Sequence, residues 1–306
     1  MVSSGVILMV YIITFVIGFP ANLLALYAFS AKIHVKANPT DILLLNLTVS
    51  DLLFLLILPL KMNEAMSGMT WNLPRFLCSL TSFIFFSTIY TSSLLLMAVS
   101  LVRYIALAFP ITYHRLHKPV YAVVMGAVIW LISLANCSIT FITQYHPALA
   151  SESLDGQAHA CYENFTKKQL DVLLPIRLEL SIVFCLVPLV ICVYCYVQCI
   201  LILYSRPRIS RMQKQKAIGM ALGTLAVFLI CVLPYNISHL VGFIEGKSPE
   251  WRYYVLLLST FNTCIDPIIF YFSSSSFHCN SKKSIFRKRK LNVSELQKQV
   301  TGSNPG

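Results

Sequence analysis

The sequence predicts an all-α membrane protein, a bundle of seven transmembrane helices. Three observations predict it. Of 306 residues, 57% are hydrophobic and only 12% are charged, with a mean hydropathy of +0.72. Seven apolar runs each reach the roughly 20 residues that a helix needs to cross the hydrocarbon core, and Lys and Arg gather in alternate connections between them. Because soluble domains carry about 25% charged residues, the composition excludes a soluble enzyme, a disordered regulator and a nucleic-acid-binding protein.

The seven runs follow one another with short polar connections. The first has no charged residue before Lys32, and it is too long for the core of a signal peptide, so we interpret it as a retained anchor. The fifth carries Arg177 and Glu179 near its start. The predicted spans are 6–29, 42–62, 76–101, 120–143, 172–204, 217–244 and 251–272.

The positive charges predict the orientation of the bundle. The connections after the first, third and fifth spans and the C-terminal tail hold seventeen Lys and Arg, and the remaining connections and helix ends hold seven. Because Lys and Arg are in excess on the cytoplasmic side of membrane proteins, we expect the N-terminus outside and the tail inside. We expect a receptor domain over 1–275, and over 276–306 an amphipathic helix on the inner leaflet with a short tail. Cys279 in that tail is either palmitoylated or unmodified.

Polar residues inside apolar spans are costly and functional by default. Those of this chain form an ordered set, which resembles the rhodopsin-class G-protein-coupled receptors over about residues 5–290. The set comprises Asn22 in the first span, Asp51 in the second, Arg103-Tyr104 closing the third, Trp130, Pro188 and Pro234 within the fourth to sixth, and Asn262 and Asp266-Pro267 in the seventh.

Four longer runs resemble one subgroup, the short-chain free fatty acid receptors. The resemblance implies a plasma-membrane receptor, not an enzyme and without a resident cofactor, for carboxylic acids such as acetate, propionate and butyrate. It implies signalling through heterotrimeric G proteins, Gi/o or also Gq, with arrestin as a further partner. The alternatives are a receptor of the same fold for another small anion or lipid and, less favoured, a transporter or channel. The runs are Cys161-Tyr162-Glu163-Asn164-Phe165, Leu174-Pro175-Ile176-Arg177-Leu178-Glu179, Pro234-Tyr235-Asn236-Ile237-Ser238-His239 and the ten residues from Asp266 to Ser275.

The residues themselves favour an anionic ligand. The third span contains no Asp or Glu, the group with which amine receptors hold a cationic ligand. Arg177 and Arg252 instead stand near the outer helix ends, and the planar guanidinium matches a carboxylate in two parallel hydrogen bonds. Tyr235 and His239 are four residues apart, hence on one helix face. The resemblance implies that Arg177, His239 and Arg252 hold the ligand carboxylate. The further residues expected in the binding site are Tyr235, Tyr90, Phe86, Glu163 and Asn136.

Two alternatives remain open for these residues. In the first alternative, the arginines pair with Glu163, Glu179 or another loop acid instead of a ligand, and His239 has only a structural role. The second concerns the aromatic residues: Phe86, Tyr90 and also Tyr145 either form walls that exclude longer ligand tails or simply pack between helices. Asn136 stands where close relatives have a histidine, which predicts altered ligand selectivity.

The resemblance also implies a disulfide, a switch and an ion site. Cys78 and Cys161 both fall on the outer side, where disulfides persist, and Asn164 in Asn164-Phe165-Thr166 matches a glycosylation acceptor. Arg103 and Tyr104, with Asp266 and Pro267, match the G-protein switch, although Val102 replaces the usual acidic neighbour of the arginine and Val232 the usual aromatic residue before Pro234. We expect a polar core that holds either a sodium ion or a water-filled hydrogen-bond network, built from Asn22, Asp51, Ser92, Asn262 and Asp266.

Overall fold

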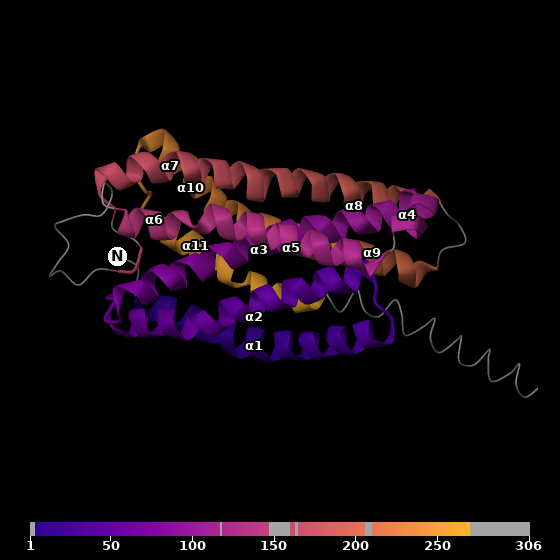
Figure 1. Ribbon diagram of the computed structural model, residues 1–306, viewed down its shortest axis with the longest axis horizontal. Helices are drawn as coiled ribbons and strands as arrows, with labels where there is room; N and C mark the ends of the chain where they lie inside the picture. Colours follow the sequence, from indigo (N-terminus) through magenta and orange to yellow (C-terminus); the bar gives the residue numbers. More distant parts are fainter. Residues whose placement is uncertain (1–3, 117, 147–159, 163–164, 206–209, 270–306) are drawn as a thin grey trace, which may run out of the picture.

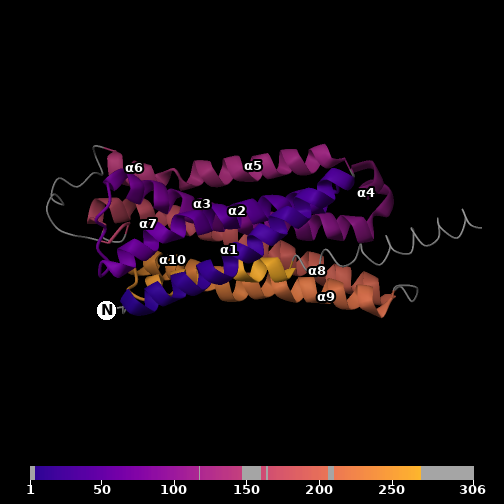
Figure 2. The same ribbon diagram turned by 90° about the horizontal axis from the view of Figure 1, so that it is seen from below.

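The computed structural model describes residues 4–116, 118–146, 160–162, 165–205 and 210–269, with the side chains of Arg115, Leu116 and Gln213 excepted. These residues form an elongated bundle whose helices run lengthwise (Figure 1). The turned view shows the same parallel arrangement, with the N-terminus, α6 and α7 at one end and α4 and the start of α9 at the other (Figure 2). We call the first the disulfide end, because Cys78 and Cys161 are bonded there.

Three long helices open the bundle. They are α1 (Ser4–Val35), α2 (Pro39–Met66) and α3 (Arg75–Ala108), which cover the first three predicted spans and extend each of them at both ends. Pro39 stands in the first turn of α2, where its missing N–H has no helical acceptor to lose. The short helix α4 (Pro110–Leu116) follows α3.

The next three spans are interrupted helices. The fourth consists of α5 (Pro119–Cys137) and α6 (Ile139–Tyr145). The fifth contains α7 (Lys167–Ser181), a π-helical turn η1 (Ile182–Leu186) and α8 (Val187–Ser205), and the sixth contains α9 (Arg211–Ala226), η2 (Val227–Val232) and α10 (Leu233–Glu245). Both π-turns directly precede the proline region of their span. Pro188 and Pro234 cannot donate to the carbonyl four residues earlier, and a wider turn accommodates that loss.

The seventh span is described in part. Helix α11 (Arg252–Thr260) ends at a turn at Phe261, and helical backbone resumes over 262–269. The remaining predicted positions, 270–272, lie outside the described residues, as does the expected tail helix. In the described part of the chain, six helices are long and apolar enough to cross a membrane.

The burial pattern suits a helix bundle surrounded by lipid. Leu24 of α1, Leu131 of α5 and Val190 of α8 are each more than 60% exposed on the outside of the bundle. Helix α3 lies at the centre, and most of its side chains are buried between the other helices. The exposed apolar faces are what a helix needs towards hydrocarbon, where burial against protein is not required.

The two charge groups used for the orientation lie at opposite ends. The elements of the disulfide end carry Lys61, Arg75, Lys167, Lys168, Arg177, Lys247 and Arg252. The other half of the bundle carries Lys32, Lys36, Arg103, Lys118, Arg211, Lys214 and Lys216. The side chain of Arg115 and residues 206–209 and 270–306, which carry the rest of the predicted inner charges, lie outside the described part.

Candidate ligand-binding site

A pocket opens between the helices near the disulfide end. Helices α3, α7, α10 and α11 and the segment around Cys161 supply most of the walls. The lining residues are Phe86, Tyr90, Cys137, Ile139, Thr140, Tyr162, Leu173, Ile176, Arg177, Leu180, Tyr235, His239 and Arg252.

Arg177 reaches the pocket from α7. This helix starts with a capping box, in which the Gln169 N–H donates to Thr166 Oγ1 and the Thr166 N–H donates to Gln169 Oε1, and the box fixes where its first turn begins. The Arg177 guanidinium lies over the Phe165 ring, 4.9 Å from its centroid, and donates to Ser248 Oγ at 2.9 Å. Arg177 is 6% exposed, so an aromatic face and a hydroxyl hold the cation largely out of solvent.

Arg252, Tyr235 and His239 form one connected group. Arg252 Nη2 donates to the Tyr235 hydroxyl at 3.1 Å, and the Tyr235 and His239 rings meet edge to face with centroids 4.4 Å apart. The four-residue spacing therefore places both side chains on the same face of α10, as predicted. Both ring nitrogens of His239 are buried, and none of the described residues hydrogen-bonds to either. A buried polar group without a partner is costly, so these nitrogens are suited to a ligand or water.

Aromatic rings close the pocket around the cations. Phe86 stacks on Tyr235 at 6.2 Å and packs against Tyr162 at 5.7 Å, and Tyr90 packs on Phe184 at 5.2 Å. Tyr162 covers the pocket from the segment that follows Cys161, and burial raises the pKa of its phenol above the usual value near 10. The Tyr162 hydroxyl is therefore neutral at physiological pH and acts as a polar but uncharged group.

Six predicted ligand residues line this pocket: Arg177, Arg252, His239, Tyr235, Tyr90 and Phe86. The structure does not bring Asn136 there, because its amide donates to Ile132 O of its own helix at 2.8 Å while the adjacent Cys137 faces the pocket. Tyr145 is 47% exposed and packs on Phe141, away from the pocket. Glu179 is exposed on α7, whereas Glu163 and Asn164 lie outside the described residues.

A second hollow adjoins the first. It shares Phe86, Tyr162 and Arg252 with it and is otherwise lined by Tyr11, Lys61, Ser82, Phe85, Cys161, Tyr253 and Leu256. Arg252 thus stands at the border of two compartments, so that an anion bound to it has space on either side.

Sequence reasoning did not identify the parts of this site that come from the connections between helices. Phe165 supports Arg177, Tyr162 roofs the pocket, and Ser248 accepts from Arg177. The position of Tyr162 beside a bonded cysteine was the one signal available for any of them. The predicted disulfide itself is present and joins Cys78 of α3 to Cys161.

Comparison with known proteins identifies the family. Residues 21–270 match the model of the 7 transmembrane receptor (rhodopsin family). The chain is 45% identical over 272 residues to free fatty acid receptor 3 of Mus musculus, covering 89% of this chain and 84% of the relative, and 46% identical over 274 residues to free fatty acid receptor 2 of Homo sapiens, covering 89% and 83%. This chain belongs to the free fatty acid receptors of the rhodopsin family. It is therefore a multi-pass membrane receptor that couples to G proteins, and not an enzyme.

The identities do not separate the two subgroups. The Cys161–Phe165 run of this receptor favours free fatty acid receptor 2 over receptor 3, yet human receptor 3 is 45% identical over 271 residues, against 46% for human receptor 2. The preference for receptor 2 stays a prediction from one loop.

The middle of the receptor contains the expected polar group. Asn22, Asp51, Asn262 and Asp266 are all at most 5% exposed, Asp51 interacts electrostatically with Asp266, and Ser92 exchanges a hydrogen bond with Ser50 at 3.2 Å. Asn22 donates to Gly18 O and Thr263 O, which ties α1 to the seventh span. Apart from the contact between the Asp51 and Asp266 carboxyl groups, no donor among the described residues reaches Asn22 Oδ1, Asp51 Oδ2, Asn262 Oδ1 or either carboxylate oxygen of Asp266. Buried acceptors in this number fit a hydrated cation or a water network.

The predicted switch lies in the half of the receptor opposite the disulfide. Arg103 lies within electrostatic range of Asp41 and Tyr196, and Asp41 also forms an ion pair with Lys32 at 2.6 Å. Tyr104 packs edge to face against Phe109 and Tyr194. Pro267 follows Asp266 in the helical backbone of the seventh span.

Proposed function

We propose that this receptor binds short-chain carboxylic acids such as acetate, propionate and butyrate, and that Arg177, His239 and Arg252 hold the carboxylate. The observation that carries the proposal is the pairing of two nearly buried arginines with a histidine whose nitrogens meet no donor or acceptor among the described residues, all in one small pocket. The relatives named as free fatty acid receptors support the same ligand class.

The arrangement distributes the work among these residues. The two guanidinium groups approach from α7 and α11, so a carboxylate between them receives donors from both sides. The Tyr235 hydroxyl orients Arg252, and His239 adds one more polar group on the same wall. The aromatic and aliphatic side chains, Phe86, Tyr90, Ile176 and Leu180 among them, leave an apolar space for a short alkyl tail.

The size of such a ligand limits its affinity. Acetate has four heavy atoms, and the best small ligands gain at most about 1.5 kcal/mol per heavy atom. The ceiling is thus about −6 kcal/mol, which corresponds to a dissociation constant on the order of tens of micromolar. We therefore expect responses in the micromolar to millimolar range.

We further propose that the disulfide end faces the outside of the cell and that the opposite end engages a heterotrimeric G protein, Gi/o or also Gq, and arrestin. The distribution of Lys and Arg supports this orientation. A glycan on Asn164 belongs to the same proposal, because it requires the outer side.

For the polar core we propose a sodium ion held by Asp51, Ser92, Asn262 and Asp266, supported by buried oxygen acceptors that meet no donor among the described residues. When bound, the ion would neutralise carboxylate charge.

The testing experiment is a concentration series of straight-chain C2 to C6 acids, with longer acids, in a nucleotide-exchange assay on membranes that contain the receptor and a G protein. Propionamide serves as the control, since it has nearly the shape of propionate without its charge. We expect micromolar to millimolar activation by the short acids and none by the amide. Activation by propionamide would contradict the proposal, and so would a lack of activation by all of the acids.

The second compartment favours one alternative ligand class. Its access to Arg252 gives space for the tail of a larger carboxylate. A larger acid that activates at concentrations far below those of propionate, in the same series, would favour this alternative.

A further inference from the structure

We propose that Glu64 is a positioning residue for the ligand pocket: together with the disulfide it anchors the Cys161–Tyr162 segment over the arginines. This inference rests on the proposed function where it concerns acid potency. The interaction of Glu64 with the segment itself does not depend on the ligand.

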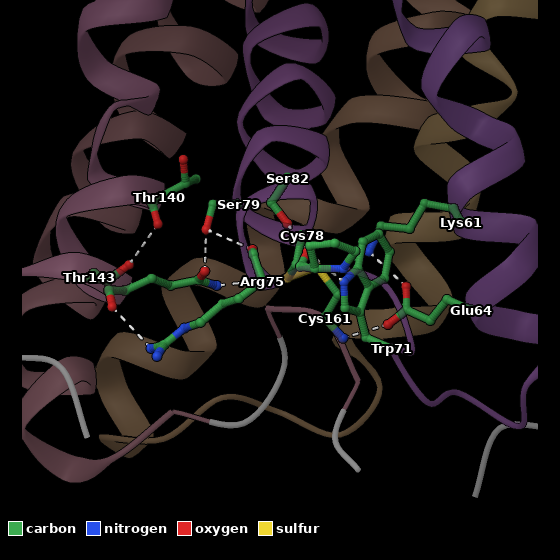
Figure 3. Close-up of a disulfide and its surroundings, with 12 residues drawn as sticks. Lys61, Glu64, Trp71, Arg75, Cys78, Ser79, Ser82, Thr140, Thr143 and Cys161 are labelled. Carbon is green, nitrogen blue, oxygen red and sulfur yellow. Dashed lines mark hydrogen bonds and ion pairs between the residues drawn. A yellow bond between two sulfur atoms is a disulfide. The ribbon is translucent and has the colours of Figure 1, made fainter. Parts of the chain in front are cut away.

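Glu64 stands in the last turns of α2 and uses both of its carboxylate oxygens (Figure 3). Oε1 accepts the backbone N–H of Cys161 at 2.5 Å, and Oε2 pairs with Lys61 Nζ at 3.0 Å. The carboxylate side chain is 2% exposed. Charge-assisted hydrogen bonds of this kind are about twice as strong as neutral ones, so the link between α2 and the segment is substantial.

The disulfide and the Glu64 hydrogen bond together fix the orientation of Cys161, which the disulfide alone does not. The disulfide ties Cys161 to Cys78 of α3 but leaves rotation about its own single bonds. The Glu64 contact joins the same residue to a different helix, α2, and to the backbone rather than the side chain. With both in place, the direction in which the chain leaves Cys161 is determined.

The direction of the chain after Cys161 determines the position of Tyr162, which covers the pocket. Tyr162, the next residue, has a left-handed backbone with φ of 61°, a conformation that non-glycine residues rarely adopt without support. Its ring packs on Phe86 and, at 4.9 Å, on Phe165, and Phe165 in turn lies under Arg177. A continuous series of contacts therefore runs from Glu64 through Cys161 and Tyr162 to the guanidinium.

Lys61 makes this anchor compatible with an anionic ligand. A bare carboxylate beside the pockets would compete with the ligand for Arg252, which lines the same compartment as Lys61. Paired with Lys61, Glu64 contributes no net charge, and Lys61 Nζ also lies 5.9 Å from the centre of the Trp71 ring. Removing only one member would leave a buried unpaired charge, so a clean test changes both.

Two double variants isolate the hydrogen bond. Lys61→Met with Glu64→Gln keeps an amide oxygen that accepts the Cys161 N–H, whereas Lys61→Met with Glu64→Leu removes the acceptor. Both pairs are neutral and similar in size. Glu64→Asp, which keeps the charge but shortens the side chain by one methylene, is the third variant, used if the Leu variant fails to reach the surface.

The readouts are hydrogen exchange at the Cys161–Tyr162 amides in purified receptor and propionate concentration-response curves at matched surface amounts. Relative to the Gln variant, we expect the Leu variant to exchange at least tenfold faster and to need about tenfold more propionate, with the same maximal response. Glu64→Asp is expected to change in the same direction relative to wild type. Ser79→Ala is the control, because Ser79 follows Cys78 but bonds to Gln144 of α6 and not to the segment; its exchange should match wild type.

Equal exchange in the two double variants would overturn the anchor. Faster exchange with unchanged propionate potency would show an anchor that does not position the pocket, and would overturn the proposal equally. A wild-type receptor that responds to none of the acids would contradict the proposed function, whereas exchange would still decide whether Glu64 holds the segment.

Discussion

Arg177 and Arg252 approach the pocket from different helices, with an aromatic ring beside each: Phe165 for Arg177 and Tyr235 for Arg252. Replacing either by Lys keeps the positive charge but loses the planar pair of donors that matches a carboxylate. We therefore expect Arg177→Lys and Arg252→Lys each to weaken the response to propionate at least tenfold. The measurement is nucleotide exchange at equal surface amounts. Wild-type potency in both variants would contradict the carboxylate clamp.

Individual residues also show how far the site could be predicted. Tyr235 and His239 were found because helix periodicity fixes which side chains share a face, and the arginines because a buried cation needs a counter-charge. Asn136 failed to reach the pocket because a rotation of one residue on α5 turns Cys137 inward instead. Phe165 and Tyr162 belong to a non-helical segment, where no periodicity relates sequence position to direction.

At the scale of single elements, the disulfide holds a segment with little secondary structure of its own. Cys161 and Tyr162 form a turn within the long connection from α6 to α7. Without the covalent link to α3, the pocket roof is left with the Glu64 hydrogen bond and the packing of the Tyr162 ring on Phe86 and Phe165. We expect Cys78→Ser and Cys161→Ser to lose the acid response or surface delivery, as measured by surface labelling together with concentration-response curves. Normal signalling by either variant would show that this element does not depend on the disulfide.

The end of α3 lacks the acidic neighbour that holds its arginine in related receptors. A lost charge-assisted hydrogen bond is worth about 1.5–3 kcal/mol, which would raise the active fraction by a factor of about 10 to 100 if nothing replaced it. Asp41 and Tyr196 lie in electrostatic range of Arg103. We expect measurable nucleotide exchange without ligand, lower in Val102→Glu than in wild type. Equal basal rates in matched amounts of the two receptors would show that Val102 does not loosen this switch.

At the scale of the whole molecule, the order and approximate ends of the six spans described in full followed from hydropathy, because a helix in lipid must be long, apolar and internally hydrogen-bonded. The seventh predicted span is described only in part. The six spans described in full match their predicted runs and extend them by one to seven residues at each end. The π-turns were not predicted. Pro188 and Pro234 mark where a helix is disturbed, but whether it kinks, breaks or widens depends on packing against its neighbours.

The orientation of the molecule gives the last prediction, because it follows from the charges of all connections together. Three exposed lysines, Lys167, Lys168 and Lys247, lie at the disulfide end, and two, Lys36 and Lys118, lie at the opposite end. A membrane-impermeant amine reagent applied to intact cells should label the first group, and the second only after permeabilisation. Peptide mapping by mass spectrometry measures both groups in one sample. The reverse pattern would place the pocket with its arginines on the cytoplasmic side, out of reach of an extracellular acid, and would contradict the proposed orientation together with the route of the ligand.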